Sequence, residues 1–262
     1  MAKINNDKYY TPIDLAACCI NKTYEIIGKE NISEIIEPSA GNGSFSNQID
    51  CIAYDIEPEH KDIIKQDYLT LELSYKKGRL IIGNPPYGRC LNLAQKFYKK
   101  SIELGDYIAF ILPISQLNNS NSMYEFDLIY SEDLGKKDYS GINLHCCFNI
   151  YKRNPNGLNK HKIKKLKDIT IIRQDSKKYN DILNYDIRMC HWGNGSAGKI
   201  LKENEHYSAE YKIIIHNKEL KNKIIEVLNN IDWKQELNHI AMLEIQQFHI
   251  CELLKKYIPE IK

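Results

Sequence analysis

The sequence contains no Cys-x-x-Cys pair, although eight cysteines occur among its 262 residues. Two adjacent pairs, Cys18-Cys19 and Cys146-Cys147, and four single cysteines do not have the spacing of a zinc site or of a thioredoxin-type redox site. We therefore predict no metal site. We expect most of the cysteines to be small buried hydrophobic residues in a reducing compartment.

Long apolar runs are also missing. No stretch approaches the roughly 20 apolar residues that a membrane-spanning helix needs, and residues 1–8 lack the apolar core of a signal peptide. No repeat or low-complexity tract interrupts the chain. These absences favour a cytoplasmic protein with no membrane partner, and the length suffices for one large domain and a smaller one.

The strongest functional signal is the string Asn84-Pro85-Pro86-Tyr87, which follows an apolar run at 80–83 that we interpret as a short buried strand. Two prolines remove two backbone donors and fix two φ angles, so the chain leaves the strand in a stiff extended turn. The Asn84 carbonyl and a backbone carbonyl remain as acceptors, with an aromatic ring beside them. This combination suits a flat substrate that carries an NH₂ group. A proline-rich loop that caps a strand is the alternative.

A second motif, Glu37 to Phe45, follows another short apolar run and contains two glycines, Gly41 and Gly43. The third glycine of a dinucleotide fingerprint is missing. Asp55, at the end of the next apolar run, follows Gly43 by 12 residues, where a dinucleotide fold has about 20. The pattern therefore favours a nucleoside cofactor without a pyrophosphate, and Glu37 suits a cationic group better than a phosphate.

In order along the chain, these segments resemble the S-adenosylmethionine-dependent DNA adenine-N6 methyltransferases. The resemblance covers about residues 8–152, and its motifs are Tyr9-Tyr10-Thr11-Pro12, Glu37-Pro38-x-x-Gly41-x-Gly43, Asp55 to Pro58, Gln66-Asp67-Tyr68 and Asn84 to Tyr87. The order of the motifs resembles the subgroup that has a recognition region after the catalytic motif.

The resemblance implies S-adenosylmethionine as the cofactor and assigns residues to it. Asp55 would accept hydrogen bonds from the ribose hydroxyls, Ile56 would pack on the adenine, and Asp67 would accept from the adenine amino group. The full implied cofactor site is Tyr10, Thr11, Glu37, Pro38, Ala40, Gly41, Gly43, Asp55, Ile56, Asp67, Tyr68 and Asn84. For Asp55 and Asp67 the alternative is a strand-end carboxylate that caps the following turn.

The implied catalytic residues are Asn84, Pro85, Pro86, Tyr87 and Phe148. The Asn84 and Pro85 carbonyls would accept the two N–H bonds of a target adenine, so that the lone pair of the amine is aimed at the sulfonium methyl group. Because a duplex hides this amine, the base would be flipped out of the DNA and stacked on Tyr87. Phe148 would be a second aromatic contact, with a core role as its alternative.

The predicted fold class is α/β: a Rossmann-like, doubly wound and mostly parallel sheet, followed by a small carboxy-terminal region. The resemblance implies an antiparallel edge hairpin, formed by the strand at 142–151 and one near 126–130. We expect helices at 11–28, with Thr11 as N-cap, and at 90–104. The glycine motif is also expected to lead into a helix. Strands are expected near 33–37, 51–55, 63–66, 79–83, 107–112, 126–130 and 142–151.

After residue 151 the charge pattern changes. Residues 152–178 contain ten Lys or Arg against two Asp, a local net charge of +8 in a chain whose net charge is +2. We predict a catalytic domain at 1–152 and a DNA-recognition region at 153–262, with helices at 217–230 and 234–257 and an adaptable loop at 186–199. The predicted DNA-binding residues are Lys160, Lys162, Lys164, Lys165, Lys167, Arg188 and Lys199. A solvated basic linker is the alternative.

The predicted function is therefore a site-specific DNA adenine-N6 methyltransferase of a restriction–modification, phage or mobile-element system. A cognate restriction endonuclease would be its partner. Three alternatives remain. The same motif serves enzymes that methylate a glutamine amide, and it also fits an RNA adenine methyltransferase. A non-catalytic nucleic-acid-binding subunit is the third, although the intact Asn84 and glycine turn disfavour it.

Overall fold

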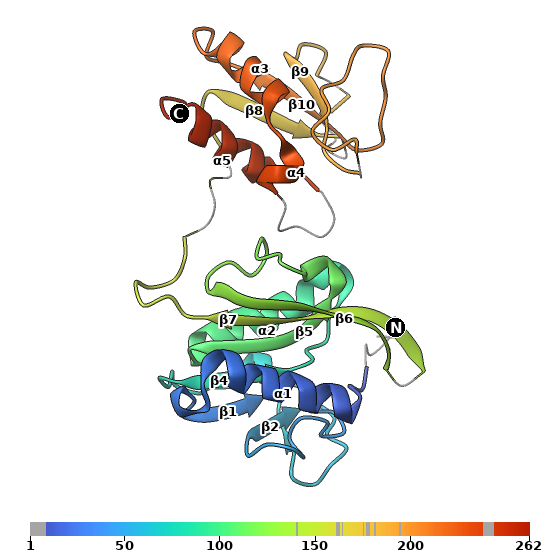
Figure 1. Cartoon of the computed structure of the whole chain (residues 1–262), viewed down its shortest axis with the longest axis vertical. Helices are drawn as coiled ribbons and strands as arrows, with labels where there is room; N and C mark the ends of the chain where they lie inside the picture. Colours follow the sequence, from blue (N-terminus) through green and yellow to red (C-terminus); the bar gives the residue numbers. More distant parts are fainter. Residues whose placement is uncertain are drawn as a thin grey trace. The chain divides into compact units, whose positions relative to one another are not determined.

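The computed structural model describes residues 9–139, 141–160, 163, 165–174, 176, 179–180, 182–193, 195–237 and 244–262. The chain divides into two compact units, residues 1–160 and 161–262 (Figure 1). Each unit has its own sheet.

The first unit is built on a seven-stranded sheet. Its strands are β1 (Glu34–Glu37), β2 (Ile52–Asp55), β3 (Ile64–Lys65), β4 (Arg79–Gly83), β5 (Tyr107–Pro113), β6 (Asp127–Tyr139) and β7 (Ile142–Lys152). Their order is β3-β2-β1-β4-β5-β7-β6. The first five strands of that order run parallel, whereas β7 is antiparallel to both β5 and β6. The predicted Rossmann-like fold with an antiparallel edge hairpin is confirmed.

Helices cover both faces of this sheet. Alternate residues of a strand point to opposite faces, so Leu80 and Ile82 of β4 pack in the core that includes residues of α1 (Ile13–Ile27), whereas Ile81 packs with residues of α2 (Asn92–Leu104). Figure 1 shows α1, in blue, running across the strands of its unit. Short 3₁₀ turns complete the unit at Lys29–Asn31 (η1), Tyr68–Thr70 (η2), Arg89–Leu91 (η3) and Ile114–Gln116 (η4).

Two local expectations in this unit are wrong. Thr11 does not cap α1, because Pro12 occupies the cap position and no side chain caps the helix. No helix follows the glycine motif either: residues 41–48 form successive turns. Gly41 and Gly43 have φ angles of 54° and 86°, a left-handed region that interrupts a right-handed helix.

The first unit continues past the predicted boundary at residue 152, because the next residues bond back to it. The Arg153 guanidinium donates to the Asp106 carboxylate at 3.1 Å. The Asn159 backbone N–H donates to the Glu125 carbonyl at 2.8 Å, and its side chain donates to Asp127 at 2.8 Å. The basic segment therefore begins on the surface of the first unit.

The second unit is a three-stranded antiparallel sheet with helices, and sequence reasoning missed its strands. They are β8 (Ile169–Arg173), β9 (Ile187–Cys190) and β10 (Glu210–Ile215), in the order β8-β10-β9, and its helices are α3 (Lys221–Asn230), α4 (Trp233–Glu236) and α5 (Gln247–Tyr257). The predicted continuous helix 234–257 is wrong, since α4 ends at Glu236 and Glu244 pairs with Trp192 in an antiparallel bridge. The Ile213 side chain lies in the core that these elements share.

Among the described residues, no helix is long and apolar enough to cross a membrane. Within the same part of the chain, no group of three or more His, Cys, Asp or Glu side chains is arranged to hold a metal ion.

Candidate active site

Three polar side chains lie where parallel strands end. Glu37 is the last residue of β1, Asp55 is the last residue of β2, and Asn84 directly follows β4. Because β1 pairs with both β2 and β4, the three carboxyl ends meet at one edge of the sheet. Ligands of open α/β sheets bind at this edge.

The glycine motif forms a tight turn at this edge that Asp55 holds in place. The Gly41 backbone N–H donates to one Asp55 carboxylate oxygen at 2.8 Å, and the Glu57 N–H donates to the other at 2.8 Å. A side chain on Gly41 would place its Cβ 3.4 Å from the Tyr10 ring. Asp55 therefore caps the turns on both sides of the edge, as the structural alternative predicted. Each carboxylate oxygen keeps a further lone pair for a ligand hydroxyl.

Glu37 is a buried carboxyl group, and among the described residues no cation lies beside it. Its side chain is 2% exposed, and one carboxylate oxygen accepts from the Ser46 backbone N–H at 2.9 Å. Burial raises the pKa of Glu37 to about 8; the charge of Asp55 adds to this, while the hydrogen bonds from Ser46 oppose it. At neutral pH the group is therefore mostly protonated, and a cationic ligand would favour its ionised form.

The Asn84 side chain is held on three sides. Its Nδ2 group donates to Thr11 Oγ1 at 3.2 Å and to the Tyr9 carbonyl at 3.4 Å, while its Oδ1 accepts from the Tyr87 hydroxyl at 3.0 Å. The Asn84 backbone carbonyl accepts from Ser39 Oγ at 3.1 Å. The Asn-Pro-Pro-Tyr turn and the glycine motif are therefore directly connected.

Tyr87 lies half-buried against its own motif. Its ring stacks on Tyr9 with the centroids 6.3 Å apart, and its hydroxyl lies 3.5 Å from Cys146 Sγ. Burial, with Cys146 nearby, raises the pKa of Tyr87 well above its usual value, so the phenol stays a hydrogen-bond donor. Pro85 is buried and Pro86 half-buried.

The remaining predicted cofactor residues surround this edge. Ile56, directly after β2, is 57% exposed, an unusual position for a large apolar side chain. Asp67 is exposed, and one of its carboxylate oxygens caps the η2 turn by accepting from the Leu69 N–H at 2.9 Å. The Tyr10 hydroxyl donates to Glu59. Pro38 and Ala40 belong to the turn itself, and the Ala40 N–H bonds to the Tyr54 carbonyl at 3.0 Å.

Two predicted ligand contacts are core residues instead. Tyr68 is 1% exposed, its hydroxyl pairs with Ser101 Oγ at 2.8 Å, and its ring stacks on Phe97. Phe148 is fully buried, because its position on β7 points it into the core beneath α1. Neither ring presents a face to a cofactor or a base, so we remove both from the candidate site.

The predicted DNA-binding residues are of three kinds: exposed, buried, or outside the described residues. Lys160, Lys165 and Lys167 are exposed, whereas Lys162 and Lys164 lie outside the described residues. Lys199 is also exposed, but it pairs with Glu205 at 2.6 Å.

Arg188 requires a correction, because its side chain is only 7% exposed. Its guanidinium pairs with Glu210 at 3.2 Å and donates to the Glu205 carbonyl. A cation committed to a buried partner is not available to a phosphate, so we remove Arg188 from the DNA-binding set.

Sequence reasoning missed the serines that join the motifs. Ser44 Oγ donates to the Thr11 carbonyl at 2.7 Å, Ser39 bonds to Asn84, and the Ser46 N–H bonds to Glu37. All three lie in the turn after β1, and their partners are 9 to 45 residues away along the chain. The small residues of the turn were visible in the sequence, but the pairings depend on the fold.

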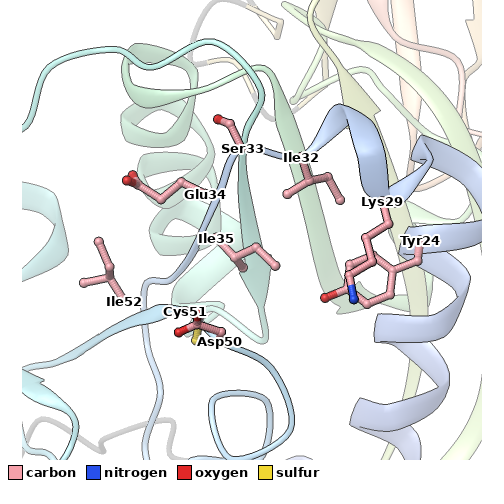
Figure 2. A pocket seen from close by; sticks show the side chains of 9 residues that line it. All are labelled: Tyr24, Lys29, Ile32, Ser33, Glu34, Ile35, Asp50, Cys51 and Ile52. Atoms are coloured by element: carbon pink, nitrogen blue, oxygen red, sulfur yellow. The ribbon is translucent and has the colours of Figure 1, made fainter.

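A hollow of about 360 Å³ lies at the opposite edge of the sheet. Figure 2 shows its lining, which includes Lys29 and Glu34 near the start of β1 and Asp50 and Cys51 before β2. These residues lie at or just before the starts of their strands, so the hollow is at the amino-terminal ends and is separate from the candidate site.

A doubly wound sheet with these motifs at its carboxyl edge has the architecture of the methyltransferase class that the sequence resembles. No family model matches the chain. Two curated proteins are 31% identical to it over 104 residues: the Type II methyltransferases M.HincII of Haemophilus influenzae and M.HindII of Haemophilus influenzae strain Rd. Each match covers 36% of this chain and 19% of the relative, so the chain spans about a fifth of the length of the curated relatives it matches. The resemblance to methyltransferases is thereby confirmed over about a third of the chain.

Solved structures show a weaker likeness. The Pyrococcus horikoshii protein PH1948, a candidate RNA methyltransferase, is 13% identical with a TM-score of 0.45, and the alignment covers 58% of this chain and 90% of that one. A candidate class I S-adenosylmethionine-dependent methyltransferase of Listeria monocytogenes is 13% identical with a TM-score of 0.46, over 60% of this chain and 64% of that one. At these values the fold class rests on the strand order and pairing described above.

Proposed function

We propose that the protein is an S-adenosylmethionine-dependent methyltransferase that modifies the exocyclic N6 of adenine in DNA. The observation that carries the proposal is the position of Asn84 at the carboxyl edge of the sheet, bonded to Ser39 of the glycine motif at 3.1 Å. The candidate group that orients an amine and the candidate cofactor turn thus form one site. The sequence match to two Type II methyltransferases supports the same class.

The residues at this edge fit S-adenosylmethionine by charge and polarity. The buried Glu37, which has no neighbouring cation within the described residues, lies where the cationic methionine portion would bind. Asp55 retains acceptor capacity for ribose hydroxyls, and the exposed Ile56 offers an apolar surface to a purine. Asp67, exposed near the same edge, would accept from its amino group. When bound, the cofactor supplies an electrophilic methyl group on a sulfonium.

The chain's own contribution to catalysis is orientation. The Asn84 amide and the Pro85 carbonyl accept the two N–H bonds of the target amine, which draws the nitrogen towards tetrahedral geometry. Asn84 Oδ1 already accepts from Tyr87, so the amine either shares this oxygen or displaces the phenol. The Asn-Pro-Pro-Tyr motif supplies no general base, and the proton leaves to water after transfer.

The DNA substrate is supported by the Type II methyltransferase relatives and by the exposed lysines 160, 165 and 167. In a duplex the adenine must be flipped out, which costs a few kcal/mol, and an aromatic face then holds it. Tyr87, whose hydroxyl lies 3.0 Å from Asn84 Oδ1, is the candidate aromatic, and its ring would have to leave Tyr9 to accept a base. A cognate restriction endonuclease would complete a restriction–modification pair.

The test is transfer of radiolabelled methyl groups from S-adenosylmethionine to unmethylated duplex DNA. The product is digested to nucleosides, and N6-methyl-2′-deoxyadenosine is identified by mass spectrometry. Parallel reactions with RNA and with glutamine-containing peptides separate the two enzymatic alternatives. Label in none of the three acceptors, with intact cofactor binding, would instead favour the non-catalytic subunit.

A further inference from the structure

The orientation of the Asn84 amide is fixed from its nitrogen side. An amide carries a donor end and an acceptor end, which differ only in hydrogen bonding. Here the nitrogen faces two acceptors, Thr11 Oγ1 at 3.2 Å and the Tyr9 carbonyl at 3.4 Å, and the oxygen faces the Tyr87 hydroxyl. A rotated amide would set its oxygen against the Tyr9 carbonyl, which has no proton to give. The network therefore selects the orientation that presents an acceptor on the side of Tyr87.

Burial and hydrogen bonding fix the position of Thr11 beside Asn84. The residue is 6% exposed, and it is followed by Pro12, which has φ of −53° and precedes α1. Its backbone carbonyl accepts from Ser44 Oγ at 2.7 Å, which links it to the turn after β1. Burial and these links leave the Thr11 side chain facing Asn84.

We propose that Thr11 is a positioning residue for Asn84. The Tyr9 carbonyl selects the orientation of the amide, and the Thr11 hydroxyl, by accepting from the Asn84 nitrogen at 3.2 Å, holds the amide in that orientation with its oxygen available to meet the target amine. This inference rests on the proposed function, since it assumes that Asn84 orients an amine. It assigns Thr11 a different role from the cofactor contact that the sequence resemblance implied.

Three variants test the assignment. Thr11→Val removes the acceptor but keeps the shape of the side chain, and Thr11→Ser keeps the hydroxyl. Thr23→Val is the matched control, because Thr23 is fully buried on α1 and its hydroxyl donates to the Cys19 carbonyl at 2.7 Å. At saturating cofactor and DNA, Thr11→Val should lower the transfer rate about ten- to a hundredfold. Its cofactor Kd should stay within about twofold of wild type, and Thr11→Ser and Thr23→Val should keep their rates within about threefold.

A second measurement does not depend on activity. The side-chain amide protons of Asn84 in ¹⁵N-labelled, cofactor-free protein should exchange faster in Thr11→Val than in wild type or Thr23→Val. If Thr11→Val keeps both the wild-type rate and the wild-type exchange, the proposal is overturned. If its cofactor Kd rises while the saturated rate is unchanged, Thr11 contacts the cofactor instead. A wild-type protein that methylates no acceptor would refute the proposed function, and the exchange measurement would still decide the role of Thr11 in orienting the amide.

Discussion

Two buried glutamates, one in each unit, have opposite electrostatics. Glu37 is 2% exposed, no cation in the described part of the chain lies beside it, and burial raises its pKa to about 8. Glu210 is 3% exposed; burial also raises its pKa, but hydrogen bonds from Tyr179 and the charge of Arg188 outweigh that effect and lower it. Glu210 is stabilised as a carboxylate by partners within its own unit, whereas Glu37 would ionise readily only with a bound cation. A buried acid with a raised pKa at the carboxyl edge of such a sheet is typical of a functional site.

The same contrast separates the two units as a whole. In the first unit the polar side chains Glu37, Asp55 and Asn84 end parallel strands and meet at one edge. In the second unit the buried cation Arg188 is used to hold β9 against β10. Charge in the sequence is therefore a poor guide to an interaction surface unless its partner is known. Under the proposed function, methyl transfer would belong to the first unit, and any nucleic-acid contact of the second would depend on its exposed lysines.

The largest expected effect is that of Asn84→Ala, which tests whether the first unit carries out methyl transfer. The substitution deletes the acceptor that orients the target amine, so the transfer rate should fall by about a hundredfold or more. Cofactor Kd should stay close to the wild-type value, because Asp55 and the glycine turn are untouched. Single-turnover transfer to DNA and calorimetric titration of the cofactor provide the two readouts.

Asn84→Asp is the companion variant to Asn84→Ala. Its carboxylate still accepts from an amine, but it can no longer donate to Thr11 and the Tyr9 carbonyl, so partial activity is expected. A wild-type rate in Asn84→Ala would remove Asn84 from the mechanism.

A second prediction concerns the basic segment. Replacing Lys160, Lys165 and Lys167 with Gln should weaken DNA binding about tenfold or more at 0.1 M salt. The slope of log affinity against log salt should flatten by up to about 3, because each phosphate contact contributes about 0.9. Fluorescence anisotropy with a labelled duplex over a range of salt concentrations measures both quantities.

The control for the basic segment carries the same change of charge elsewhere. Lys29, Lys218 and Lys234 are all exposed, and Lys29 lies at the amino-terminal edge of the sheet, away from the candidate site. Equal losses in the two triple variants would mean that only net charge matters, and the segment would be a solvated linker.

These units also differ in how far the sequence predicted them. Six strands of the first unit were predicted to within one residue at each end, because they are short apolar runs bounded by Gly, Pro or Asp. The exception is β6, predicted at 126–130, which extends to Tyr139 through a polar stretch that gave no strand signal. Asn84 and the glycine motif were found for the same reason: their conformations are local. The fully buried Phe148 and the 1% exposed Tyr68 were misjudged, since which face of a strand or turn a ring occupies depends on distant packing.

In the second unit local signals failed. The strands β8 and β10 are apolar runs without Gly or Pro at their ends, and their pairing joins residues about 40 positions apart. Residues 244–246 were included in a predicted helix because apolar residues recur there at helical spacing, but Glu244 pairs with Trp192. The Arg188–Glu210 pair is likewise invisible before the register of β9 and β10 is known.

A third prediction separates the two roles of Asp55. Asp55→Ala should weaken cofactor binding about tenfold, partly because the Gly41 N–H loses its partner and the turn loosens. Asp55→Asn keeps one oxygen as an acceptor for a backbone N–H, so it should weaken binding less and leave thermal stability near wild type. Calorimetry and thermal unfolding together distinguish the roles. Equal cofactor affinity in wild type and Asp55→Ala would leave Asp55 with the capping role alone.

The smallest expected effect is a pH dependence of stability and cofactor affinity that arises from Glu37, the glutamate whose pKa is raised. Because the pKa of Glu37 in the free protein is raised to about 8, its contribution to stability is present below its usual pKa and is lost as the pH rises through 8. Glu37→Gln should therefore gain thermal stability relative to wild type above pH 8. A bound cation favours the carboxylate, so cofactor affinity should rise several-fold between pH 6 and pH 8, with proton release detectable by calorimetry in buffers of different ionisation enthalpy. Glu37→Gln should bind more weakly at pH 8 and show neither the rise nor the proton release. A flat pH profile in wild type would mean that Glu37 keeps its proton in the complex, and it would then be a buried structural acid like any other hydrogen-bonded core group.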